Sequence, residues 1–80
     1  MYVGQHIAVR PIRNPSGRVT WGLYRPYHQD RSPFDAFESE TFADRVAEII
    51  ETRFDGSYAA PARKLAKAMA RRELTPGESA

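Results

Sequence analysis

Side chains able to do acid-base, nucleophilic or metal chemistry are few and scattered along this chain of 80 residues. There is no cysteine, and the two histidines, His6 and His28, do not combine with carboxylates at a metal-ligand spacing. The serines stand in turn, cap or tail contexts without a neighbouring base that could activate a hydroxyl group. The five glycines are dispersed and form no phosphate-binding loop. The sequence therefore predicts no catalytic residue, no metal site and no cofactor, and we expect a binding protein rather than an enzyme.

Charge is more informative, because it is strongly segregated along the chain. Residues 1–28 carry a net charge of +4, residues 29–55 carry −5 and residues 56–80 carry +3, although the whole chain is only +2. Separate positive and negative surfaces guide the association of macromolecules. We therefore looked for partner contacts in each of the three segments.

The first segment mixes arginine with aromatic residues and predicts a basic β-hairpin over residues 1–28. Its two apolar runs are separated by Asn14 to Gly17, a strong turn signal. Alternation directs Ile7 and Val9 to the core and Arg10 and Tyr24 outward. Arginine with aromatics occurs in nucleic-acid-binding sheets and in protein hot spots, and also on ordinary solvent-facing strands. The candidate partner contacts here are Arg10, Arg13, Arg18, Trp21, Tyr24, Arg25 and Tyr27.

The acidic segment predicts a short strand over residues 33–38 and an amphipathic helix over residues 40–55. Ser39 or Thr41 is the expected N-cap, and Gly56 the expected C-terminal stop. Four carboxylates recur along one helix face, and such like charges repel one another. We favour a solvated face balanced by the basic second helix or the hairpin arginines, with docking to a basic partner as the alternative. These candidate residues are Asp44, Glu48, Glu51 and Asp55.

The last segment predicts a basic, alanine-rich helix over residues 59–74, followed by a tail over residues 75–80. Leu65, Ala66 and Met69 recur at helical spacing and are expected to pack inward. A basic stripe beside them complements the helix dipole or contacts phosphates. The candidates for nucleic-acid contact are Arg63, Lys64, Lys67 and Arg71.

Together these elements predict one α+β domain over residues 1–80. Its expected core is an antiparallel sheet of two or three strands followed by two helices packed on one face. The lack of cysteine fits the cytoplasm, and no stretch approaches the ~20 apolar residues of a membrane span. Because a core of this size is marginal, we also consider a homodimer.

Two resemblances suggest a function. The junction from Phe37 to Ala43, followed by Val46 and Ala47, is similar to that of the arm-type DNA-binding domains of phage integrases, which combine a three-stranded sheet with a helix. This resemblance implies a small nucleic-acid-binding domain. The prolines in the hairpin depart from a regular groove-binding strand pair.

The second resemblance rests on the whole build, meaning the arginine hairpin, the acidic helix and the alanine-rich helix. It is similar to that of anti-CRISPR proteins of phages and mobile elements, which are small α+β chains with segregated charge. This resemblance implies a non-enzymatic inhibitor that covers part of a protein or ribonucleoprotein, such as the DNA-binding surface of a CRISPR effector complex. We take the inhibitor as the leading hypothesis and the nucleic-acid-binding domain as the alternative.

Overall fold

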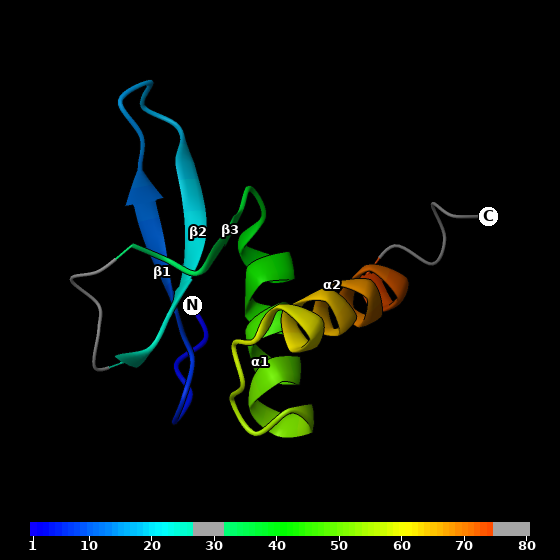
Figure 1. Cartoon of the computed structure of the whole chain (residues 1–80). Coiled ribbons are helices and arrows are strands. Elements are labelled where there is room, and N and C mark those ends of the chain that lie inside the picture. Colours follow the sequence, from blue (N-terminus) through cyan, green and yellow to red (C-terminus); the bar gives the residue numbers. More distant parts are fainter. Residues whose placement is uncertain (27–31, 75–80) are drawn as a thin grey trace.

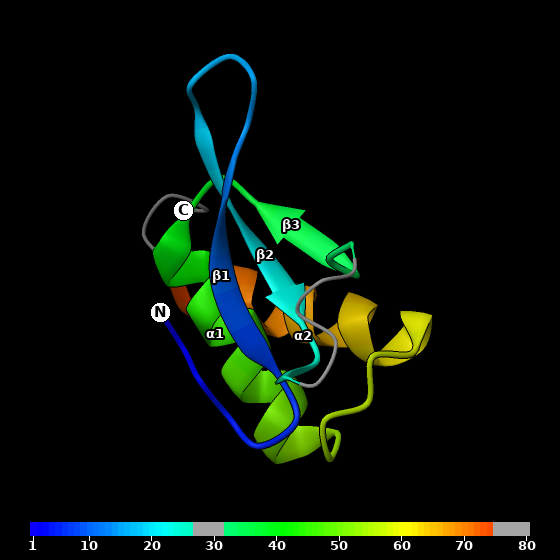
Figure 2. The ribbon, with the colours of Figure 1, turned by 90° about the vertical axis from the view of Figure 1, so that its left-hand side faces the viewer.

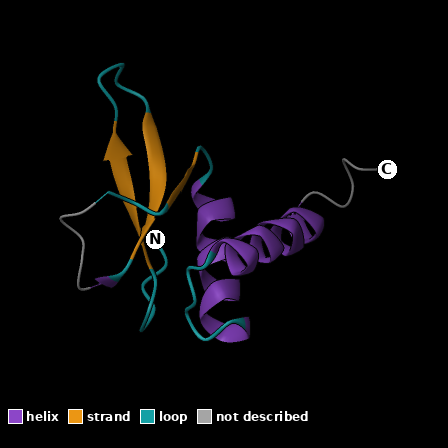
Figure 3. Cartoon of the chain, in the orientation of Figure 1, coloured by secondary structure: helices purple, strands orange, loops and turns teal. Residues whose placement is uncertain are grey.

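The computed structural model describes residues 1–26 and 32–74. It contains a three-stranded antiparallel sheet in the order β1-β2-β3, followed by two helices (Figure 1; the same elements are coloured by type in Figure 3). The elements are β1 (Ala8–Arg13), β2 (Val19–Tyr24), β3 (Asp35–Phe37), α1 (Glu40–Arg53) and α2 (Ala60–Leu74). The predicted α+β architecture is confirmed, including the third strand. Tyr27 and the tail over residues 75–80 lie outside the described residues.

The hairpin forms around the predicted turn. Asn14 N–H donates to the Arg18 carbonyl and Gly17 N–H to the Asn14 carbonyl, both at 2.9 Å. Antiparallel pairs alternate between hydrogen-bonded and non-hydrogen-bonded, so Pro11, opposite Trp21, falls at a non-hydrogen-bonded pair. The ring therefore costs no ladder hydrogen bond, and β1 is in addition an edge strand, where proline is tolerated.

The run from His6 to Arg13 predicts a strand that begins at His6, but β1 begins at Ala8. An N-terminal segment, residues 1–7, folds back along β1, where Val3 pairs with Ala8 and Val9 N–H donates to the Tyr2 carbonyl at 2.9 Å. His6 and Ile7 leave the strand because their N–H groups bind a carboxylate of α1 instead. This segment therefore lies alongside both the sheet and the helix.

The core lies between the sheet and α1. Ile7, Val9 and Leu23 are fully buried, and Trp21 packs against the same cluster. Phe37 in β3 meets Phe42 in α1, with ring centres 5.1 Å apart in an edge-to-face arrangement. From α1 the buried residues are Ala43, Val46, Ala47, Ile49 and Ile50.

Both ends of α1 follow the expected capping chemistry. Of the two predicted N-caps the chain uses Ser39, whose Oγ accepts from Phe42 N–H at 3.2 Å. At the other end Gly56 has a φ of 74°, and its N–H donates to the Ile50 carbonyl at 2.8 Å. A side chain at Gly56 would also collide with His6. Glycine is therefore required here by its dihedral angle and by its neighbour.

The second helix crosses α1 on the side away from the sheet (Figure 1). It contacts α1 through Ala62, Ala66 and Ala70, which recur every four residues and allow the two helices to approach closely. The prediction that Leu65 faces inward is wrong, because this side chain is 54% exposed. It is rotated by about 100° around the helix from Ala66, away from the alanine seam.

Candidate nucleic-acid interface

One face of the sheet is left uncovered by the helices (Figure 2). Pairing across the sheet places alternate residues on this open face, opposite the side that carries Val9 and Leu23. The positions of the open face are Ala8, Arg10, Ile12, Thr20, Gly22, Tyr24 and Ala36, of which Ala8 and Gly22 are buried. None of these described positions is a carboxylate. The predicted outward direction of Arg10 and Tyr24 is confirmed.

The centre of the open face is a shallow apolar cluster over Gly22. A Cβ atom at Gly22 would lie 2.7 Å from Ile12 Cδ1, 2.9 Å from Pro33 Cβ and 3.0 Å from Tyr24 Cε1. These three side chains therefore lie almost against the backbone of β2. Glycine in this strand serves a close approach of neighbouring side chains.

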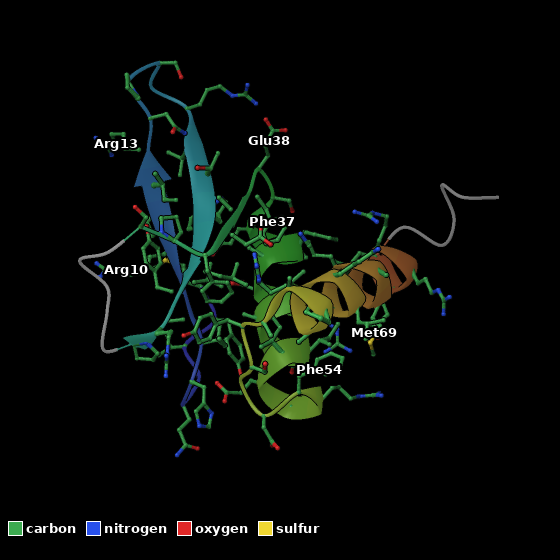
Figure 4. The ribbon with its side chains drawn as sticks, viewed as in Figure 1. Arg10, Arg13, Phe37, Glu38, Phe54 and Met69 are labelled. Atoms are coloured by element: carbon green, nitrogen blue, oxygen red, sulfur yellow. The ribbon has the colours of Figure 1, made fainter. Side chains whose placement is uncertain are left out.

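Arginines surround this cluster. Arg10 is exposed on the middle of β1, and Figure 4 shows it on the side of the sheet that points away from the helices. Arg13 alternates onto the other face of β1, but it lies at the end of the strand, where its exposed side chain also extends away from the helices in Figure 4. At the turn, Arg18 Nη2 lies 2.5 Å from Glu38 Oε1, and the two side chains are 70% and 74% exposed. An ion pair so open to solvent contributes little to stability, so Arg18 is free to exchange this partner for another.

The other predicted contacts of the hairpin are placed differently. Trp21 packs against the core on the helix side of the sheet and is not part of the open face. Arg25 follows the end of β2 and lies over the ring of Tyr58, from the loop between the helices. The predicted set is therefore divided between the two sides of the sheet.

The carboxylates of α1 are held by the chain itself. Tyr2 N–H donates to Asp44 Oδ1 at 2.7 Å. His6 and Ile7 N–H groups donate to Glu51 Oε1 at 2.7 and 3.1 Å, and the His6 ring contacts the second Glu51 oxygen. The expected balancing charges were the basic helix or the hairpin arginines, but backbone N–H groups of the N-terminal segment have this role.

The protonation of Glu51 reflects these contacts. Its side chain is only 12% exposed, and burial acts to raise the pKa of the carboxyl group. The hydrogen bonds from His6 and Ile7 outweigh burial and hold that pKa below its ordinary value. Glu51 is therefore a charged structural anchor between α1 and the N-terminal segment.

The other two predicted acids, Glu48 and Asp55, are placed toward α2 and solvent. Arg45 Nη1 lies 2.5 Å from Glu48 Oε1, and Arg45 Nη2 donates to Glu73 Oε1 of α2 at 3.0 Å. The bond from Arg45 lowers the pKa of Glu73. Asp55 lies exposed just beyond the end of α1. Docking of a basic partner on the acids of this helix stays a prediction.

The predicted basic stripe of α2 is likewise divided. Arg63 Nη1 donates to the Phe34 carbonyl at 2.8 Å, and Lys67 Nζ lies 3.0 Å from Asp35 Oδ2. This oxygen is buried, and its contact with Lys67 is an ion pair without the alignment of a hydrogen bond. These two cations fasten α2 to β3, whereas the others, Lys64 and Arg71, are exposed on α2.

Phe34 and Tyr58 are contact residues that the sequence did not indicate. Their ring centres are 5.6 Å apart, and each ring also meets an arginine. They lie 24 positions apart in separate loops, so no local pattern could have paired them.

No family model, curated protein or solved structure gives a significant match to this chain. In the part of the chain that the structure describes, no helix is long and apolar enough to cross a membrane. Over the same residues, no three His, Cys, Asp or Glu side chains gather where they could hold a metal ion.

Proposed function

We propose that this chain binds double-stranded DNA with the open face of its sheet and its arginine hairpin. The observation that supports this most is the charge of that face. It presents Arg10, with Arg13 and Arg18 beside the turn, and includes no carboxylate at the described positions. Phosphate contacts by such side chains supply most of the affinity of small DNA-binding domains.

The acidic segment is the main objection, since eight acids in residues 29–55 would repel phosphates if they shared the binding face. Asp44 and Glu51 instead bind the N-terminal segment, and Asp35 binds Lys67 on the helix side. Glu38 is the acid that lies beside a hairpin arginine. The negative charges of Asp44, Glu51 and Asp35 therefore lie away from the proposed contact surface.

The shape of the surface favours a duplex over a single strand. Single-stranded nucleic acid is usually held by several aromatic rings on which the bases stack. At the described positions the open face offers one such ring, Tyr24, which lies against Gly22. A two-stranded ribbon fits the major groove, which is about 12 Å wide. The hairpin is such a ribbon beyond β3, where its open face carries Ile12, and Arg10 lies next to it on β1.

Fluorescence anisotropy of labelled single- and double-stranded DNA tests this proposal, with salt varied from about 50 to 200 mM. We expect preferential binding of the duplex and a steep loss of affinity with salt. Arg10→Ala and Arg13→Ala should each weaken binding by about threefold to tenfold. Arg72→Ala removes the same charge from the end of α2, across the molecule, and is the matched control. No duplex binding at the lowest salt would refute the proposal.

A protein-binding inhibitor of the anti-CRISPR kind is our second candidate. The observation that favours it is the apolar cluster of Ile12, Pro33 and Tyr24, because a hydrophobic centre with arginine beside it is typical of protein hot spots. Pull-down with purified CRISPR effector complexes tests it. Capture that is abolished by Tyr24→Ala, in a chain that does not bind DNA alone, would favour this function over the first.

A further inference from the structure

A ladder of alternating arginine and aromatic side chains lies at the end of the sheet opposite the hairpin turn. The Arg25 guanidinium lies 4.8 Å from the centre of the Tyr58 ring. Tyr58 is tilted against Phe34, with ring centres 5.6 Å apart, and the Arg63 guanidinium lies 5.9 Å from the Phe34 ring centre. The order Arg25, Tyr58, Phe34, Arg63 joins four side chains from three parts of the chain.

Hydrogen bonds fix this ladder from its inner end. Arg63 Nε donates to the Tyr58 carbonyl and Nη1 to the Phe34 carbonyl, both at 2.8 Å. Arg63 is only partly exposed. Its two hydrogen bonds tie the loop before α2 to the segment that leads into β3. The backbones of Phe34 and Tyr58 are therefore both fixed by Arg63, independently of Arg25.

The outer end of the ladder is Arg25, which is exposed although its position is fixed. Its Nη1 donates to Tyr58 Oη at 3.1 Å, and Tyr58 itself is 45% exposed. A guanidinium stacked on a ring keeps further N–H donors in its own plane, which match the oxygens of a phosphate. Stacking also restricts the side chain beforehand, so less conformational entropy is lost when an anion binds.

Arg25 lies beyond the end of β2 that is opposite the hairpin turn. The six residues of β2 span about 20 Å, because each residue of a strand advances about 3.4 Å. Arg13 and Arg18 lie at one end of this length and Arg25 at the other, with the open face between them. If β2 lies across the major groove, which is roughly 12 Å wide, this spacing lets cations at both ends reach past the edges of the groove toward the two backbones.

Resting on the proposed DNA-binding function, we propose that Arg25 is a second phosphate anchor and that Tyr58 is the residue that positions it. The ligand is a backbone phosphate of the duplex, on the strand opposite to the one that the hairpin turn contacts. Tyr58 makes no contact with DNA and acts through the orientation of the guanidinium group.

Duplex binding by Arg25→Ala, Tyr58→Leu and Tyr58→Phe, each as a function of salt, tests the proposal. Arg25→Ala should weaken binding about threefold to tenfold and reduce the slope of log affinity against log salt by about one, as loss of one phosphate contact requires. Tyr58→Leu should weaken binding in the natural chain and have no further effect in the Arg25→Ala chain. Tyr58→Phe keeps the ring and should retain most of the affinity.

Thermal unfolding of each variant separates a structural role from a positioning role. A loss of stability alone leaves the salt slope of the folded protein unchanged, so an unchanged slope in Arg25→Ala would overturn the anchor. Independent effects of Arg25→Ala and Tyr58→Leu would overturn the positioning by Tyr58. If the natural chain binds no duplex, the DNA-binding function itself fails. Binding that depends on Arg10 but not on Arg25 refutes only the anchor.

Discussion

The acidic side of α1 and the arginine hairpin are the two charged regions of this molecule, and their charges are used in opposite ways. On α1, Asp44 and Glu51 accept backbone N–H groups of the N-terminal segment. On the hairpin, Arg18 shares with Glu38 an ion pair in which both side chains are largely exposed to solvent. A charge that satisfies buried or half-buried backbone groups holds the fold together, whereas a charge held only by solvent-exposed partners stays available for a ligand.

The largest effect should come from Glu51→Ala. This change leaves the N–H groups of His6 and Ile7 without their acceptor, and hydrogen bonds to a charged group contribute about 1.5 to 3 kcal/mol each. We expect a loss of about 2 to 3 kcal/mol in the free energy of unfolding, measured by urea denaturation. Asp55→Ala, also on the acidic side but exposed, should change it by less than about 0.5 kcal/mol. Equal losses in the two variants would contradict the distinction drawn here.

Arg63→Ala should have the next largest effect on stability. Arg63 donates to the carbonyls of Tyr58 and Phe34, so its loss removes one link from α2 to the loop before it and one to the segment before β3. We expect a loss of about 1 to 2 kcal/mol in the free energy of unfolding. Arg13→Ala should leave stability unchanged within about 0.5 kcal/mol while weakening DNA binding. A destabilised Arg13→Ala variant would show that the hairpin arginines are structural as well.

The contribution of Glu51 to the free energy of unfolding should depend on pH. Its pKa in the folded chain lies below the ordinary value of 4.5, so its charged form is favoured by folding. The resulting stability is fully present above the ordinary value and is lost as the pH falls through the lowered pKa. Urea unfolding at pH 6 and pH 3 should therefore show a gap between the natural chain and Glu51→Gln that narrows in acid. A gap that is constant or widens in acid would be inconsistent with a lowered pKa.

The smallest effect should come from Glu38→Gln. This change removes the negative charge 2.5 Å from Arg18, and because both side chains are largely exposed, stability should stay the same. Duplex affinity at low salt should rise by about twofold to threefold, since Arg18 no longer exchanges Glu38 for a phosphate. Anisotropy in parallel with Arg18→Ala provides the measurement. A fall in affinity would mean that Glu38 orients Arg18 for binding rather than competing with the ligand.

Much of the fold follows from local signals in the sequence. The turn at Asn14 to Gly17, the N-cap at Ser39 and the stop at Gly56 are each specified within a few residues, and all three are present. The α1 and α2 bounds differ from the predicted ranges by two residues or fewer, as fraying and capping at helix ends allow. Alternation also predicts that Arg10 and Tyr24 lie on the outer face of the sheet.

Which residues form the candidate site follows only from the tertiary structure. Alternation places Trp21 and Tyr24 on opposite faces of β2, but both were candidate contacts, and the packing of α1 on the Trp21 side makes that residue part of the core. Leu65 has the same apolar character as any core residue, but the alanine seam of α2 excludes it. A single hydrophobic pattern cannot state which of two available faces another element will cover.

The sequence by itself determined the kind, the order and the approximate ends of the elements, because turns, caps and periodicity act between neighbours. Only the tertiary structure decided which charges are used inside the chain. His6 meets Glu51 across 45 positions, and Arg25 meets Tyr58 across 33. Such pairs depend on how distant segments pack, and an exposed arginine and one already bound by the fold are identical in the sequence.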